Sequence, residues 1–130
     1  MLNIQFCLEE MQGKLFENAA KLGYDSENFV RLFMRSQLAS QLDMDYSRMQ
    51  FVDEEYWMEE LQDTYGDKLA KGTSLSPQEM FWLGYIYRSW HHKTGESSRE
   101  ILKRANFKKM TKLYTTEYYN DCDSVLEQLG

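Results

Sequence analysis

Apolar residues recur every three or four positions along most of this chain, the spacing that places them on one face of an α-helix. The first such series runs from Ile4 to Leu22 and is followed by Gly23. A second covers residues 25–42, and Asp25 stands where it can cap the first turn. No segment shows a convincing alternation of apolar and polar residues, which is typical of a half-buried strand. The pattern predicts helices throughout.

Capping and turn residues predict further helices along the rest of the chain. In chain order, they cover residues 53–65, 77–94, 98–105, 107–114 and 125–129, the last after a cap among residues 121–124. The helices at 77 and 98 each follow a serine with a glutamate three positions later, which is the capping-box pattern. Pro77 stands at a first helical position, where the missing N–H of proline removes no helical hydrogen bond. The sequence therefore predicts six or seven helices.

Helix 77–94 is predicted to lie at the centre of a single compact all-α domain that covers residues 1–130. One half of this helix is fully apolar, with Met80, Leu83, Ile86, Tyr87 and Trp90. The chain is 42% hydrophobic and contains only seven glycines and one proline, a composition that excludes collagen-like and disordered chains. Its apolar runs are much shorter than the roughly 20 residues of a membrane-spanning helix, so no membrane is expected as a partner.

The cysteines and the N-terminal residues predict a reducing, cytoplasmic setting. Cys7 and Cys122 are far apart and neither belongs to a CxxC motif, so both are expected to be free thiols. The N-terminal segment has no basic region and reaches Glu9 too early for a secretory signal. No group of residues has metal-ligand spacing, so neither a metal nor another cofactor is expected.

Charge is distributed unevenly along the chain. The formal net charge is −6, which argues against general coating of nucleic acid. Segment 43–67 contains nine acidic residues and one basic residue, whereas segment 88–112 contains eight basic and two acidic residues. Either the two segments face each other in the fold and neutralise one another, or one or both form a charged surface that attracts a partner. The sequence leaves both interpretations open.

The predicted helix 53–65 carries the first candidate binding surface. A helical wheel places Tyr56 among acidic residues on one half of this helix, opposite its apolar half. A solvated acidic face needs no tyrosine, whereas an interface often has an aromatic anchor surrounded by charge. The candidate partner-binding residues here are Tyr56, Glu59, Glu60 and Asp63. A simple solvated surface is the alternative.

The second candidate surface is a stripe on the central helix. It consists of Phe81, Tyr85, Arg88 and His92, which follow one another at helical spacing. Gly84 beside this stripe would allow another backbone to approach closely. The stripe is either a second packing face within the fold or a groove in which Tyr85, Arg88 and His92 bind a partner. Gly13, inside the first helix, predicts a close contact of its own.

Residues typical of enzyme active sites are mostly missing. His91 and His92 are adjacent, so on a helix they point about 100° apart and cannot bind one metal together. No ExxH motif, glycine-rich phosphate loop or GxSxG motif occurs. Arg88 and His92 invite comparison with the Arg–His pair of HEPN-type ribonucleases, but the number of residues between them is smaller than in that motif. The sequence therefore predicts that the protein is not an enzyme.

A longer stretch of the sequence resembles a group of bacterial proteins. Segment 84–98 reads GYIYRSWHHKTGESS, and it is preceded by FMRS at 33–36 and by Leu42-Asp43. It is similar to small bacterial proteins with a GYIYRYW-like core, a helix that begins at paired serines and a tyrosine-rich C-terminal segment. Members of that group are encoded beside putative toxins, some of ADP-ribosyltransferase type, and are suspected antitoxins. The resemblance covers most of the chain and implies a toxin–antitoxin or mobile-element context rather than a mechanism.

These observations favour a non-enzymatic protein that binds and neutralises a cognate partner protein, either a toxin or a defence enzyme. One alternative is a nucleic-acid-binding regulator that uses the basic segment 99–112, although the net charge makes nucleic acid the less expected partner. Another is an inhibitor from a phage or mobile element whose acidic surface imitates nucleic-acid phosphates.

Overall fold

The computed structural model describes residues 4–116 and 122–129, which fold mostly into helices. The α-helices are α1 (Ile4–Lys21), α2 (Ser26–Met34), α3 (Gln37–Leu42), α4 (Glu54–Tyr65), α5 (Pro77–Thr94), α6 (Ser98–Arg104), α7 (Phe107–Thr116) and α8 (Cys122–Leu129). Two short 3₁₀ helices, η1 (Arg48–Phe51) and η2 (Gly66–Lys68), flank α4 in the sequence. No strand occurs among the described residues, and the all-α prediction is confirmed. None of the described helices is long and apolar enough to cross a membrane.

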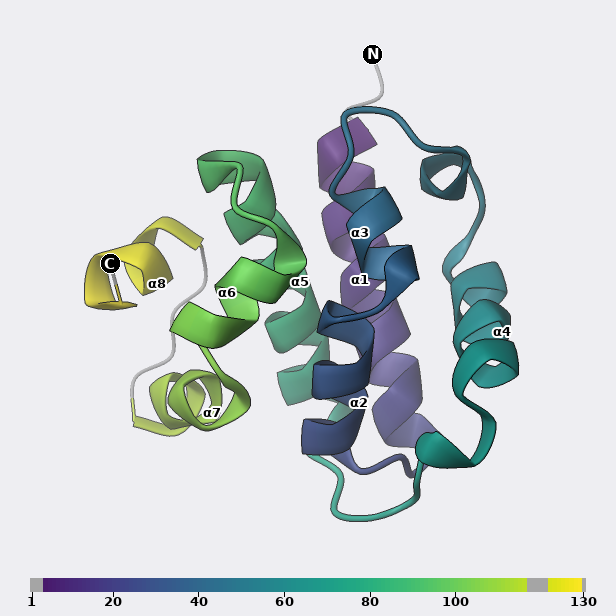
Figure 1. The fold of residues 1–130 in the computed structure, drawn as a ribbon. Helices are drawn as coiled ribbons and strands as arrows, with labels where there is room; N and C mark the ends of the chain where they lie inside the picture. Colours follow the sequence, from purple (N-terminus) through teal and green to yellow (C-terminus); the bar gives the residue numbers. More distant parts are fainter. Residues whose placement is uncertain (1–3, 117–121, 130) are drawn as a thin grey trace.

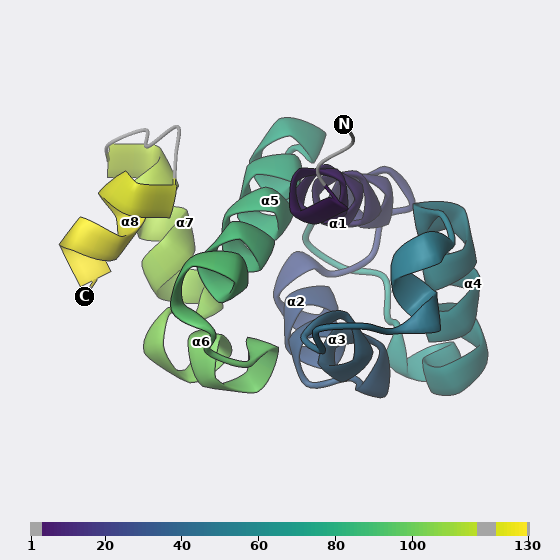
Figure 2. The same ribbon diagram turned by 90° about the horizontal axis from the view of Figure 1, so that it is seen from above.

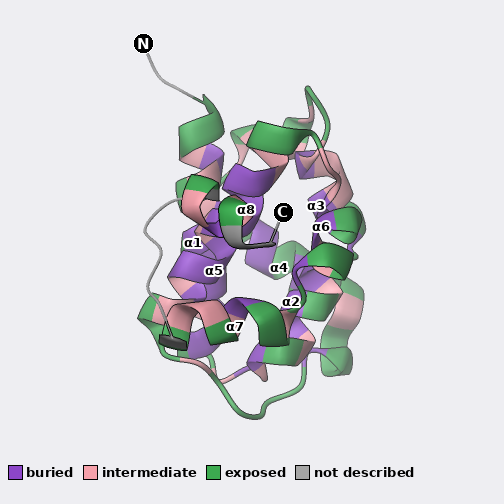
Figure 3. Cartoon of the chain, turned by 90° about the vertical axis from the view of Figure 1, so that its left-hand side faces the viewer, coloured by how far each residue is buried: buried purple, intermediate pink, exposed green. Residues whose placement is uncertain are grey.

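Helix α5 occupies the centre of the fold, as the sequence predicts. Figures 1 and 2 show it beside α1, with α4 on the outer side of α1 and with α7 and α8 on the opposite side of α5. Between Met80 and Trp90, every residue of α5 except Phe81 and Tyr85 is buried. The apolar half expected from the sequence is therefore in the core, and neighbouring helices cover most of the remainder (Figure 3).

The backbones of α1 and α5 come close together at Gly84. A Cβ atom at this position would lie 2.5 Å from the carbonyl oxygen of Gln12 and 2.8 Å from the ring of Phe16. Gln12 also donates a hydrogen bond from Nε2 to the carbonyl oxygen of Gly84, at 3.0 Å. On α1, a Cβ atom at Gly13 would lie 2.9 Å from the ring of Phe81. The close contacts predicted at both glycines are confirmed.

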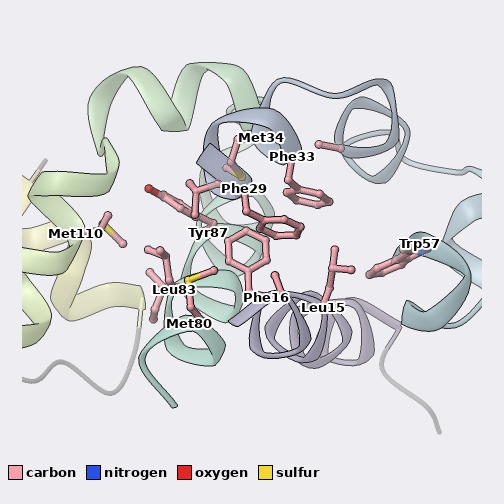
Figure 4. Packing of buried hydrophobic residues seen from close by; sticks show 14 of the residues in the cluster. Leu15, Phe16, Phe29, Phe33, Met34, Trp57, Met80, Leu83, Tyr87 and Met110 are labelled. Carbon is pink, nitrogen blue, oxygen red and sulfur yellow. The ribbon is translucent and has the colours of Figure 1, made fainter. Parts of the chain in front are cut away.

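Aromatic side chains fill the space between α1, α2 and α5 (Figure 4). Phe16 meets Phe29 and Phe33 edge to face, with ring centroids 5.4 and 5.3 Å apart. Tyr87 is buried in the same core, and its hydroxyl donates a hydrogen bond to the carbonyl oxygen of Ala105, at 2.6 Å. Burial raises the pKa of Tyr87, so the hydroxyl keeps its proton and remains a donor. This bond attaches the end of α6 to the central helix.

The helix predicted over residues 25–42 is in fact two helices. α2 ends at Met34, and α3 begins only at Gln37. The hydroxyl of Ser36 accepts a hydrogen bond from the N–H of Ala39 at 3.0 Å and donates one to the carbonyl oxygen of Phe33 at 2.6 Å. The hydroxyl thus forms hydrogen bonds with a carbonyl oxygen and an N–H that would pair with other backbone groups in a continuous helix. Because apolar spacing does not show such a break, the described residues form eight α-helices where six or seven were predicted.

The predicted starts of α2, α4, α5 and α6 agree with the structure. The predicted N-caps Asp25, Asp53, Ser76 and Ser97 are all present. Ser97 and Glu100 exchange both hydrogen bonds of a capping box, at 3.2 and 3.0 Å. The hydroxyl of Ser76 accepts a hydrogen bond from the N–H of Glu79 at 3.1 Å, which is the serine half of the capping-box pattern. For the last helix a cap was expected among residues 121–124, but α8 already begins at Cys122, and Asp121 lies outside the described residues.

The close packing of α1 on α5 can be tested with a pair of glycine substitutions. Overpacking costs about 1–3 kcal/mol, and at Gly84 the obstacle is backbone, which cannot rotate away. We therefore expect Gly84→Ala to lower the free energy of unfolding despite the gain of about 1 kcal/mol that alanine brings to a helix. Gly13→Ala is the matched control, because it meets only the edge of the half-buried Phe81 ring and should change stability far less. Urea denaturation measures both, and equal stability of the two variants would contradict the expectation.

Candidate functional site

The outward half of α4 is acidic and carries an aromatic side chain. Trp57, Met58 and Leu61 bury the opposite half against the core. The predicted partner-binding residues on the outward half are Tyr56, Glu59, Glu60 and Asp63, and all four are exposed. Within the described part of the chain, none of these three acids forms an ion pair. Their negative charge therefore faces solvent without a partner.

The segment that precedes α4 adds exposed apolar side chains. Seven large hydrophobic residues are exposed in the described part of the chain, and four of them lie within residues 44–56. These four, with their exposed fractions, are Met44 (54%), Tyr46 (72%), Phe51 (62%) and Tyr56 (46%). The rings of Tyr46 and Phe51 lie against one another, with centroids 5.7 Å apart. We call Met44, Tyr46, Phe51, Tyr56, Glu59, Glu60 and Asp63 the acidic–aromatic surface.

Hydrogen bonds to the backbone hold this segment in place. The indole of the buried Trp57 donates to the carbonyl oxygen of Met49 at 2.9 Å. The side-chain amide of Gln50 donates to the carbonyl oxygen of Met44 at 2.8 Å. The segment is thus attached to α4 and folded back on itself, while its large apolar side chains stay in solvent.

Sequence reasoning found the α4 part of this surface and missed the part before it. In segment 43–52 the apolar residues have neither helical nor strand spacing, so periodicity assigns them to no face. The available signal was compositional: Met44, Tyr46 and Phe51 stand among polar residues in a segment without predicted structure.

The acidic and basic segments lie mostly on opposite sides of the molecule. Figures 1 and 2 place α4 on one side of the α1–α5 pair and α7 on the other. Asp43, at the end of α3, is the one residue of segment 43–67 that pairs with the basic segment among the described residues. Mutual neutralisation therefore does not account for the acids of α4.

Tyr85 lies at the exposed edge of the stripe on α5. It is half-buried and stacks on Phe81, with ring centroids 6.3 Å apart. Both rings line a surface groove of about 690 Å³, together with Trp82 and the first residues of α5. Of the three predicted contact residues on this stripe, Tyr85 is therefore the one that borders an open groove.

Arg88 is enclosed within the fold, which corrects its predicted role as a partner contact. It is 1% exposed, and its guanidinium makes three hydrogen bonds to different elements. Nε donates to Gln12 at 2.8 Å, Nη1 to Asp43 at 2.7 Å and Nη2 to Ser98 at 3.2 Å. At 1% exposure, the guanidinium has almost no surface left for a partner to contact. The part of the stripe around Arg88 is therefore a second packing face, whereas Phe81 and Tyr85 border the groove.

The carboxylate of Asp43 balances the buried charge of Arg88. Burial lowers the pKa of Arg88, whereas the charge and hydrogen bond of Asp43 and the more distant charge of Glu9 raise it. Because a free guanidinium titrates far above neutrality, the side chain stays cationic at pH 7. Asp43 also accepts hydrogen bonds from the N–H and the hydroxyl of Ser98, both at 2.8 Å. One carboxylate thus joins α5 to the start of α6.

The two histidines are also occupied by the fold. The Nδ1–H of His92 donates to the carboxylate of Glu9 on α1 at 2.7 Å, and both side chains are largely buried. The Nδ1–H of His91 donates to the carbonyl oxygen of Glu96, also at 2.7 Å. His92 therefore stabilises the contact between α1 and α5, and its predicted contact with a partner is corrected in the same way as that of Arg88.

This arrangement of polar groups around α5 fits a structural role. A ribonuclease of the HEPN type would need its Arg–His pair to face the substrate, and here Arg88 faces Gln12 and Asp43 instead. Among the described residues, no group of three or more histidine, cysteine, aspartate or glutamate side chains could hold a metal ion. Cys7 is a free, half-buried thiol, and the side chain of Cys122 lies outside those described.

Comparisons of the chain with protein-family models, with curated proteins and with solved structures found no match.

A structural role for Arg88 predicts a large loss of stability on truncation. Arg88→Ala should lower the free energy of unfolding by about 3–5 kcal/mol, since it leaves a largely buried carboxylate without its cation. Arg104→Ala is the control, because the ion pair of Arg104 with Glu96 is partly exposed and should contribute less than about 1 kcal/mol. Both values come from urea denaturation. A loss for Arg88→Ala no larger than that of the control would restore a surface role for Arg88.

Proposed function

We propose that this protein is a non-enzymatic binding protein that neutralises a partner protein through its acidic–aromatic surface, as the antitoxin of a toxin–antitoxin pair. The observation that carries the proposal is the concentration of exposed apolar side chains within residues 44–56, next to unpaired acids of α4. The toxin context is supported by the resemblance of segment 84–98 to antitoxin-like proteins.

The core of the fold does not need the exposed apolar side chains of this surface. The core already receives its apolar contribution from Trp57, Met58 and Leu61 on the inner half of α4. Exposed aromatic residues that make no contribution to a core are typical of protein interfaces, where tyrosine and tryptophan often supply much of the binding energy. Surrounding acids then exclude unsuitable partners and accelerate encounter with suitable ones.

The chemistry of the surface defines the partner. Unpaired carboxylates on Glu59, Glu60 and Asp63 favour a basic surface, and the rings of Tyr46, Phe51 and Tyr56 favour apolar clefts or arginine side chains on it. A toxin whose substrate is anionic would present such a basic cleft. Occupying that cleft neutralises the toxin without any reaction, so one molecule of this protein inactivates one molecule of toxin.

The proposal predicts that the acidic–aromatic surface is needed for rescue and not for folding. Tyr56→Ala should weaken binding of the toxin that is encoded beside this protein by roughly thirtyfold, the equivalent of about 2 kcal/mol. Glu59→Lys, Glu60→Lys and Asp63→Lys together should abolish the rescue of cells that express this toxin. Circular dichroism and thermal melting should remain close to those of the unchanged protein, because all four side chains are exposed.

Two controls make this test decisive. Leu22→Ala removes a side chain of similar exposure, 43%, which directly follows α1 and is not part of the acidic–aromatic surface, and should leave rescue intact. Titration of purified toxin should give complete inhibition at equimolar protein. Rescue that survives the three lysine substitutions would place the interface elsewhere, and inhibition at strongly substoichiometric protein would indicate turnover and contradict a binding mechanism.

A further inference from the structure

A surface recess between α2 and α6 brings together four basic side chains. The recess has a volume of about 380 Å³. Its lining residues are Arg31, Arg35, Arg99, Leu102 and Lys103. The two elements pack against one another, and Figures 1 and 3 show them side by side. Four of the five lining residues are cationic, none is acidic, and all four cations are exposed. We call these four residues the basic recess.

The fold does not neutralise this charge. Within the described part of the chain, none of the four side chains forms an ion pair. Arg31 donates to the side-chain oxygen of Asn28 at 2.9 Å, and Arg99 donates to the carbonyl oxygen of Arg35 at 2.7 Å. Both acceptors are neutral, so they orient the guanidinium groups and leave their charge uncompensated.

The acid Glu100 interacts with Lys103 of the recess. Hydrogen bonds from Ser97 lower the pKa of Glu100, and the charge of Lys103 contributes to the same shift to a lesser extent. Glu100 is already engaged in the capping box of α6, at 3.0 Å from the N–H of Ser97. Glu100 forms no ion pair with any of the four cations of the recess.

Folding brings these like charges close together, and their repulsion destabilises the folded state. Arg99 and Lys103 are four residues apart on α6, and like charges at this spacing destabilise a helix by a few tenths of a kcal/mol per pair. Arg31 lies in the last turn of α2, and Arg35 directly follows that helix. Packing α6 on α2 then brings the two pairs around one recess. None of the four cations forms an ion pair among the described residues, so their charge is available to a ligand of opposite charge.

We propose that the basic recess binds a compact phosphate compound, of the class of pyrophosphate or a nucleoside diphosphate. Guanidinium groups match the geometry of phosphate oxygens and bind them with paired hydrogen bonds. A single phosphate monoester carries a charge of about −1.5 to −2 at pH 7, whereas a diphosphate comes closer to balancing four cations. Leu102 supplies an apolar wall, and the volume suits a small molecule.

The charge distribution favours a compact anion over a nucleic-acid strand. A strand would have to extend beyond the recess over a protein with a net charge of −6. The four cations also surround one hollow instead of following a line along the surface. This site lies apart from the acidic–aromatic surface and does not depend on the function proposed for it.

The test uses the full-length protein with pyrophosphate and with adenosine diphosphate, at constant ionic strength set by sodium chloride. Isothermal titration should show saturable binding of both compounds, and thermal melting should rise with their concentration. Arg35→Gln combined with Lys103→Gln should weaken binding at least tenfold. In the absence of ligand, the melting temperature of this variant should be no lower than that of the unchanged protein, because the substitutions relieve repulsion between like charges.

Matched controls exclude a general effect of charge. Arg48→Gln and Lys108→Gln remove exposed cations outside the recess and should leave pyrophosphate binding unchanged. Acidic–aromatic variants such as Tyr56→Ala should also still bind pyrophosphate, which separates this test from that of the proposed function. Lack of saturable binding, or equal binding by the recess variant, would overturn the proposal. Tighter binding of a DNA duplex through the same residues would overturn the assignment to a small ligand.

Discussion

Burial of the Arg88 guanidinium is the constraint on which the arrangement of this molecule depends. A buried cation is tolerated only when a carboxylate and further hydrogen-bond acceptors surround it. Its acceptors, Gln12, Asp43 and Ser98, come from three different elements. A single side chain on α5 therefore links α1, the end of α3 and the start of α6.

Both candidate surfaces begin at residues held by this network. Asp43 is followed immediately by Met44, the first residue of the acidic–aromatic surface, so the ion pair with Arg88 determines where that segment leaves the core. Ser98 precedes Arg99, so the same network determines how α6 presents its cations to α2. A partner or ligand at either surface would meet side chains carried by a well-anchored backbone.

Local features of the fold could be predicted from the sequence, whereas the long-range ones could not. Capping residues and apolar spacing identified α4 and α5 because both signals act within a few residues of the chain. The burial of Arg88 depends on Asp43, 45 residues away, and arginine is usually exposed, so sequence pattern favours the wrong location. The basic recess was missed for the same reason, because Arg35 and Arg99 are 64 residues apart.

The position of a helix in the fold explains why some predicted contact residues are exposed and others are buried. On α4, Trp57 and its apolar neighbours complete the core, so Tyr56 and the acids beside it are not needed for folding and stay available to a partner. On α5, packing on both faces leaves few positions free, so Arg88 and His92 were drawn into pairs with α1 and α3. A polar residue on a peripheral helix is therefore a better candidate for recognition than the same residue on a central helix. In this fold, the side chains available for binding are those that the core does not need for packing or for hydrogen bonding.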